Sequence, residues 1–146
     1  MASLGSFAKR MQVYANNLER NVNKTVREVA LVADRNLVLA TPVDTGRARS
    51  NWLVSVGSPN RETQEPYSPG EAGSTGSANA QAAIAQANAE ISRRKPGQDI
   101  FISNNLPYIG RLNEGSSAQA PEQFVGTAVQ SAVDVVNKAR VLRDGN

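Results

Sequence analysis

Three carboxylates occupy one short stretch in the middle of the chain, and they are the first residues whose types and spacing could do chemistry. Glu62, Glu65 and Glu71 could supply oxygen ligands of the kind that Ca²⁺ and Mg²⁺ take in proteins. The stretch around them is rich in Pro, Gly and Ser, which favours a solvated and flexible segment. We therefore interpret the three side chains as solvated and predict no metal site.

The residue types that carry most enzyme chemistry are missing from the sequence. The chain has no histidine and no cysteine, which excludes thiol catalysis, disulfides, the usual hydrolase triads and the usual zinc sites. It also lacks the Gly-rich phosphate-binding patterns and the GxSxG nucleophile motif. A carboxylate-based enzyme is the remaining catalytic option, and no pair of acidic residues at helical or strand spacing supports it. We predict no catalytic residue, no cofactor and no enzymatic activity.

The charge balance is mildly basic, with 16 Lys and Arg against 13 Asp and Glu, a net charge of +3 and a pI of about 9.6. Most of the cations are Arg, which forms bidentate contacts with carboxylates at protein interfaces as well as with phosphates. We favour interfaces. The alternative is sequence-independent DNA binding, for which the candidate residues are Arg20, Arg27, Arg93, Arg94, Arg140 and Arg143.

The chain has 146 residues, which predicts a single domain over 1–146. No apolar run is long enough to cross a membrane and the N-terminus resembles no signal segment, so we expect a protein made in a cytoplasm.

A single long helix is predicted over Ser6–Ala40, because apolar residues recur every three or four positions. The row consists of Phe7, Met11, Tyr14, Leu18, Val22, Val29 and Val32. Such a helix spans about 50 Å, which is long for this domain, so its N-terminal half is expected to project and pack on another subunit. A break near 21–23 into two helices is the alternative.

Two strands and a long insertion are predicted after this helix. Asp44-Thr45-Gly46 is a turn sequence, and the strand Asn51–Val56 follows it. The predicted second strand, Gln98–Ser103, pairs with the first. Between them lie a Pro- and Gly-rich loop over 58–78 and an Ala-rich helix over 79–94, whose thin apolar face predicts weak docking.

A short helical turn and a final long helix are predicted after the second strand. Pro107 favours a turn through Tyr108 and Leu112, which Gly115 would end. The final helix is expected over 121–143, opening at Pro121. Its predicted apolar stripe consists of Phe124, Ala128, Ala132, Val135, Ala139 and Leu142. The fold class is therefore α+β, with the N-terminal and C-terminal helices packed on a small antiparallel sheet.

Arg111 and Glu114 stand three residues apart beside the short helical turn. They could pair with each other, which is worth a few tenths of a kcal/mol. They could instead reach a neighbouring subunit, and their spacing leaves both options open.

Three segments taken together, TPVDTGRARSNW, NNLPYIGRLNEGSS and QAPEQFVGTAVQSA, resemble the head–tail joining family of tailed bacteriophages, the neck or tail-completion proteins. The resemblance covers about residues 30–135. The matching positions are Pro42, Val43, Asp44, Thr45, Gly46, Arg47, Tyr108, Glu114, Gly115, Ser116, Gln119, Pro121 and Phe124. The chain departs from the family at Ile109, where a small residue is frequent, and in the enlarged region 58–94.

The resemblance implies a structural protein that assembles as a ring, six- or twelve-fold, between the portal of the capsid and the tail. The implied partners are copies of the chain, the adjoining neck or connector and tail-tube proteins, and genomic DNA in the lumen without sequence specificity. We expect subunit or partner contacts at Arg47, Arg49, Tyr67, Arg111 and Glu114. We expect Trp52, Tyr108 and Phe124 to anchor the core, and the loop 58–78 to reach a neighbour.

Overall fold

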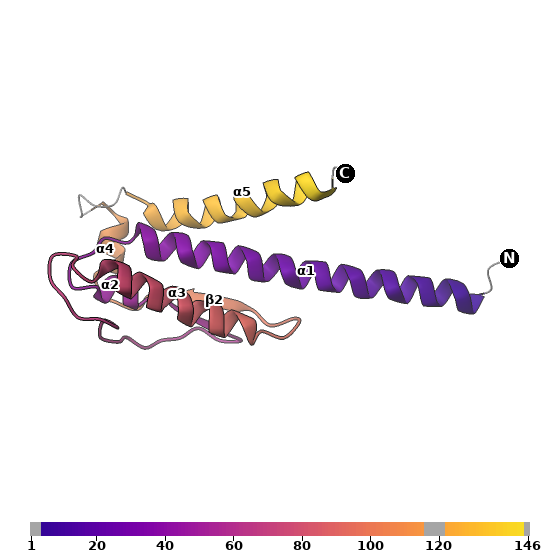
Figure 1. The fold of residues 1–146 in the computed structure, drawn as a ribbon, viewed down its shortest axis with the longest axis horizontal. Helices are drawn as coiled ribbons and strands as arrows, with labels where there is room; N and C mark the ends of the chain where they lie inside the picture. Colours follow the sequence, from indigo (N-terminus) through magenta and orange to yellow (C-terminus); the bar gives the residue numbers. More distant parts are fainter. Residues whose placement is uncertain (1–3, 116–121, 145–146) are drawn as a thin grey trace.

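One continuous helix runs along the whole molecule. The structure is a computed structural model that describes residues 4–115 and 122–144. Helix α1, Leu4–Ala40, has 37 residues and forms the long axis in Figure 1. The prediction of a single helix is therefore confirmed, and no break occurs near residues 21–23. The N-terminal half of α1 projects beyond every other element.

The two predicted strands form the small sheet. Strands β1, Leu53–Val56, and β2, Ile100–Ser103, pair antiparallel, with Leu53 opposite Ser103 and Val56 opposite Ile100. The pairing is confirmed, although both strands are shorter than predicted. The fold is a mixture of helices and a two-stranded antiparallel sheet.

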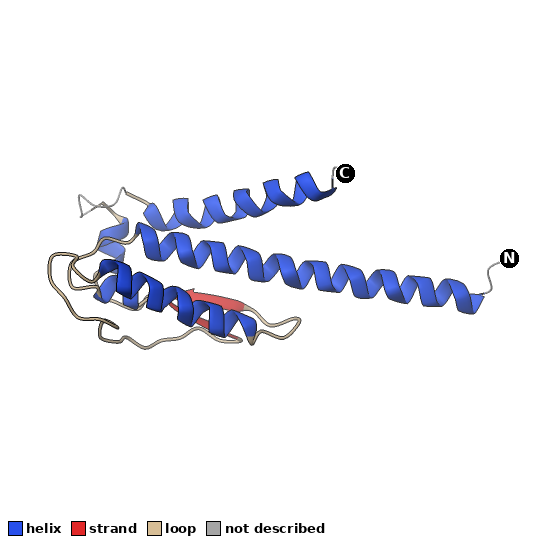
Figure 2. Cartoon of the chain, in the orientation of Figure 1, coloured by secondary structure: helices blue, strands red, loops and turns tan. Residues whose placement is uncertain are grey.

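Helix α3, Gly76–Ser92, covers the sheet, and the strands lie against it in Figure 2. The prediction of weak docking is wrong. The helix buries Ala80, Ala83, Ala87 and Ile91 between itself, α1 and β1, and Ala83 has no exposed surface. Small side chains at this spacing let the helix approach its neighbours closely, so a face that looks thin in sequence packs well. The helix also begins three residues before the predicted start at Asn79.

Helix α5, Phe124–Asp144, packs on α1 and not on the sheet. In Figure 1, α1 lies between α5 on one side and the layer of α3 and the strands on the other. The predicted arrangement, with both long helices on the sheet, is therefore wrong. The buried residues of α5 are Phe124, Ala128, Ala132 and Val136. Val135, which we placed in the buried stripe, is 54% exposed. The predicted helix start at Pro121 lies outside the described residues.

The main core cluster joins α1, α3 and α5 around Trp52. Trp52 and Phe124 are both buried there, as predicted, beside Leu37 and Val38. The indole Nε1 of Trp52 donates a hydrogen bond to the Thr41 hydroxyl at 2.7 Å. The polar edge of the ring is therefore satisfied inside the core.

Two short helices complete the fold. Helix α2, Arg47–Ser50, was not predicted, and helix α4, Ile109–Asn113, is the predicted turn after Pro107. Gly115 follows α4 with φ of +89°, the left-handed conformation expected of a residue that ends a helix. Within the described residues, no helix is long and apolar enough to span a membrane.

Candidate interaction site

The segment after α1 is held in place by Arg49. Its guanidinium donates hydrogen bonds to the carbonyls of Leu39 and Thr41, at 3.2 and 3.1 Å. These carbonyls have no partner within α1 because the helix ends there. A third bond, 3.2 Å long, reaches the Gly76 carbonyl at the start of α3. Arg49 thus joins the two helices inside the chain. Its role in a subunit contact stays a prediction, and three of its five N–H donors are already used inside the chain.

The turn Asp44–Gly46 sits against the end of the long loop. The Asp44 carbonyl accepts a hydrogen bond from the Gly73 N–H at 2.9 Å, and its carboxylate accepts one from the Ala72 N–H at 3.1 Å. Gly46 has φ of +86°, and a Cβ at this position would overlap the side-chain amide of Asn79. The turn therefore requires glycine both for its backbone conformation and for space.

Two buried amide side chains fix the loop that runs from Gly57 to Thr75. Asn51 donates to the Gln64 carbonyl and accepts from the Gln64 N–H, both at 2.8 Å. The Asn79 amide makes the same pair of hydrogen bonds with Ser68: it accepts from the backbone N–H and donates to the carbonyl, each at 2.8 Å. Both amides are fully buried. The loop is thus part of the folded chain, and replacing it with a short turn would remove two hydrogen bonds from each of two buried amides.

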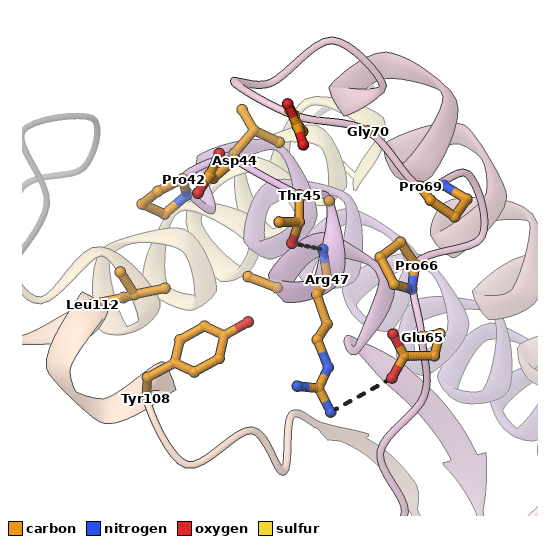
Figure 3. Close-up of a pocket in the computed structure, with 14 residues that line it drawn as sticks. Pro42, Asp44, Thr45, Arg47, Glu65, Pro66, Pro69, Gly70, Tyr108 and Leu112 are labelled. Atoms are coloured by element: carbon orange, nitrogen blue, oxygen red, sulfur yellow. Dashed lines mark hydrogen bonds and ion pairs between the residues drawn. The ribbon is translucent and has the colours of Figure 1, made fainter.

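A hollow of about 680 Å³ opens between the turn, the loop and α4. One wall is formed by residues 42–48, a second by Glu65, Pro66 and residues 69–71, and the third by Tyr108 and Leu112. Figure 3 shows Arg47 crossing the middle of this hollow, with Tyr108 and Glu65 on opposite sides of it.

The polar groups of the hollow have unused hydrogen-bonding capacity. The Arg47 Nε is buried without a hydrogen-bond partner in the described part of the chain. Its Nη2 lies 4.0 Å from a carboxylate oxygen of Glu65, whose side chain is 85% exposed. So weak and exposed an ion pair contributes little to stability. Arg47 can therefore turn its donors to a partner at low cost.

Tyr108 corrects the sequence prediction. We expected a core anchor, but the residue is 36% exposed and lines the hollow. Partial burial raises the pKa of its hydroxyl, the nearby Arg47 lowers it, and Asp44 raises it, with a net increase. The phenol therefore stays protonated at neutral pH and presents both a donor and an aromatic edge. Aromatic and Arg side chains of this kind are enriched where protein surfaces meet.

The other predicted contact residues lie around the hollow without lining it. Tyr67 is 39% exposed on the loop, and its N–H donates to the Ser50 hydroxyl at 3.2 Å. Arg111 and Glu114 are exposed at α4, and no ion pair joins them in the described part of the chain. Both are therefore accessible to a neighbour. Their predicted role stays a prediction.

Two of the arginines proposed as DNA contacts make bonds inside the chain. Arg94 is only 7% exposed, and its guanidinium donates to the Gln98 carbonyl at 2.8 Å and to the Asn23 side chain at 3.1 Å. Arg27 donates to the Arg94 carbonyl at 2.9 Å. Two of the candidate DNA contacts are therefore committed to holding α1 against the end of α3.

The carboxylates do not assemble a metal site in the part of the chain that the structure describes. No three acidic side chains there are grouped to hold an ion. Asp34 is a carboxylate of another kind, which the sequence did not single out. It is 1% exposed on α1, neither of its oxygens has a hydrogen-bond partner among the residues that the structure describes, and burial raises its pKa to about 7.

No protein-family description, curated protein or solved structure matches the chain. The function is therefore argued from the fold and from the hollow.

Proposed function

We propose that the chain is a structural virion protein of the phage neck, which forms a ring at the head–tail junction, completes or terminates the tail and lets DNA pass. The observation that carries the proposal is the hollow itself. Two segments that resemble the joining family, residues 42–47 and the one containing Tyr108, lie far apart in sequence and form opposing walls. If these two segments served the fold alone, Arg47 and Tyr108 would not need to lie at an open surface.

The chemistry of the hollow suits a protein segment. Prolines at 42, 66 and 69 give rigid walls, Arg47 supplies an Nε donor that has no partner among the described residues, and Tyr108 adds a partly exposed phenol. A ring needs a heterologous interface, in which one surface of each copy meets a different surface of the next. The hollow would be one of these two surfaces. The exposed residues Arg111 and Glu114 would lie at its margin.

The proposed partners are copies of the chain in a six- or twelve-fold ring, with an adjoining neck or connector protein and the tail tube. DNA in the lumen would be passed without sequence-specific contacts. The protein would be assembled in the host cytoplasm and would end in the virion neck. The departures at Ile109 and over residues 58–94 bear on which layer of the neck it would occupy.

The test compares variants of the hollow with a matched variant elsewhere. Arg47→Ala and Tyr108→Ala should abolish ring assembly, measured by native mass spectrometry and negative-stain electron microscopy, and should leave the circular dichroism spectrum unchanged. Arg93→Ala is the control, because its side chain is 76% exposed and pairs only within its own helix turn, with Glu90. Rings that form equally well with all three variants would refute the hollow as an interface.

The same proteins separate the proposal from the DNA-binding alternative. A ring component should bind a DNA fragment weakly at physiological salt. A DNA-binding protein loses affinity steeply as salt rises, because each phosphate contact releases counterions. Tight, salt-dependent binding by a chain that forms no ring would favour the alternative.

A further inference from the structure

The projecting half of α1 carries an exposed apolar row on one face. We call residues 5–22 the arm. Phe7, Met11, Tyr14, Leu18 and Val22 follow one another at intervals of four, three, four and four residues, and each is 47–60% exposed. This spacing keeps all five side chains on one side of the helix over about four turns. A contiguous apolar row of this kind, flanked by polar residues, marks a surface that binds something.

The same row continues into the part of α1 that the chain covers itself. Its next positions are Thr25, Val29, Val32 and Asn36, at the same spacing of three or four. Asn36 donates a hydrogen bond to the Ala128 carbonyl of α5 at 3.2 Å. At Asn36 the row therefore faces α5, and at Thr25 and Val29 it borders a hollow against residues 98–100 and Ile102, whereas the arm extends past the end of α5 (Figure 1). A helix that takes up the line of α5 would cover the row along the arm.

We propose that this occupant is the arm of a second copy of the chain, packed antiparallel. A partner helix running parallel to α1 along the row would meet α5 in its path. An antiparallel partner avoids this collision. The N-terminus of its α1 ends near the C-terminal end of α5, and the rest of the partner lies beyond the N-terminus of the first copy. The exposed row of one copy and the arm of the second copy that covers it then have the same length, because both consist of residues 5–22.

The pairing follows from the spacing of the row. With the two-fold axis beside Tyr14, Phe7 of one arm lies opposite Val22 of the other, and Met11 lies opposite Leu18. Each Tyr14 meets its own counterpart. Intervals of three and four residues are the ones that let two helices interlock as a coiled coil, and the row departs from strict alternation once, between Tyr14 and Val22.

The polar side of the arm favours a protein partner over a membrane surface. Helices that lie on membranes carry Lys and Arg across a strongly charged polar face. The polar side of the arm instead mixes four amides, Gln12, Asn16, Asn17 and Asn21, with three basic residues and one acidic residue, Lys9, Arg10, Arg20 and Glu19. Gln12 is bonded to Asn16 at 3.0 Å and Arg20 is bonded to Asn17. The inference rests on the row and on α5 and goes beyond the proposed function, because a two-fold pair is isologous. In the proposed assembly it would join the arms of two opposed rings and not those of neighbours within one ring.

Cysteine cross-linking tests the pairing directly, because the native chain has no cysteine. Tyr14→Cys should form a disulfide-linked dimer under mild oxidation. Phe7→Cys alone should not, since its two copies would be about 22 Å apart along the pair, well beyond the reach of a disulfide. Mixed with Val22→Cys it should cross-link. Asn16→Cys, exposed on the opposite face, is the matched control and should stay monomeric in the gel.

Sedimentation of the full chain gives the energetic test. Leu18→Asp should weaken self-association at least tenfold, and Asn16→Asp should not change it. Because residues 5–22 are all exposed, the circular dichroism of both variants should match that of the wild type. Self-cross-linking of Phe7→Cys would overturn the antiparallel arrangement. A monomeric wild type would overturn self-pairing altogether, and flotation of that monomer with phosphatidylglycerol–phosphatidylcholine vesicles would assign the row to a membrane surface.

Discussion

Asn79 and Ser68 are joined by two hydrogen bonds of 2.8 Å, in which the buried side-chain amide pairs with both backbone groups of the loop residue. Asn51 pairs with Gln64 in the same way. Gln86 of α3 does so with Val54, at 3.0 and 3.1 Å, and so occupies the free edge of β1 at that residue. One side-chain amide thus pairs with the edge of the sheet where a third strand could bind. The other two hold the long loop in the shape that forms the hollow.

Asn79→Ala is predicted to detach the loop from α3 and to lower the free energy of unfolding of the whole domain. The change removes the partner of both backbone groups of Ser68 and one partner of the buried Ser50 hydroxyl, at a side chain with no exposed surface. Unsatisfied buried groups cost about 1–3 kcal/mol each, so we expect a loss of about 2–4 kcal/mol in urea unfolding.

Asn88→Ala is the control for this prediction. Asn88 is an exposed residue of the same helix, and surface substitutions usually change stability by less than about 0.5 kcal/mol. If both variants unfold at the same urea concentration as the wild type, the amide pairs do not fix the loop.

Gly46→Ala is predicted to be far more costly than the same change at Gly57. Both residues have positive φ, +86° and +88°, so each substitution incurs the left-handed penalty of about 1–2 kcal/mol. At Gly57 the new methyl group meets nothing within 4 Å, whereas at Gly46 it overlaps Asn79. Thermal unfolding should therefore show a clearly lower midpoint for Gly46→Ala. Equal midpoints would contradict the close packing of the turn on α3.

Asp34 predicts an unusual dependence of stability on pH. Its pKa is about 7 in the folded chain, against an ordinary value of 3.8. The folded state therefore holds the Asp34 proton more tightly than the unfolded state does. The contribution of Asp34 to the free energy of unfolding is thus greatest at low pH, falls as the pH rises toward 7 and is constant above it. A pKa difference of one corresponds to about 1.4 kcal/mol, so we expect a loss of about 2–3 kcal/mol between about pH 5 and pH 8.5.

The absence of histidine makes this measurement clean, because no other side-chain type ordinarily titrates in that range. Asp34→Asn should flatten the profile and raise the free energy of unfolding at the higher pH. Asp99→Asn, at an exposed position, should retain the wild-type profile. A wild-type stability that is constant over this range would show that Asp34 is not buried as a carboxylic acid.

The sequence predicted the elements better than their packing. The row of α1, the pair of strands and the end of α4 at Gly115 all follow from local patterns, and all are present. The placement of α5 on α1, and of α3 on the sheet, depends on which faces fit. Alanine faces carry little signal in hydrophobic periodicity, because burial of a small side chain is decided by close approach and not by its own apolar area.

The hollow was predictable only in part. Arg47 follows a recognisable turn, but nothing local places Tyr108 opposite it, since the two are brought together by the folding of α4 against that turn. Asn51 and Asn79 gave no signal, because an amide that pairs with a distant backbone looks like any polar residue in sequence. Asp34 also looked like an ordinary helix position.

The mass of the chain in solution, measured by native mass spectrometry alone and after mixing with portal-side and tail-tube proteins, tests the central claim most directly. We predict a closed ring of a single fixed copy number in at least the mixed sample, and its loss with Arg47→Ala but not with Arg93→Ala. A chain that remains a single copy beside every one of these proteins would contradict it.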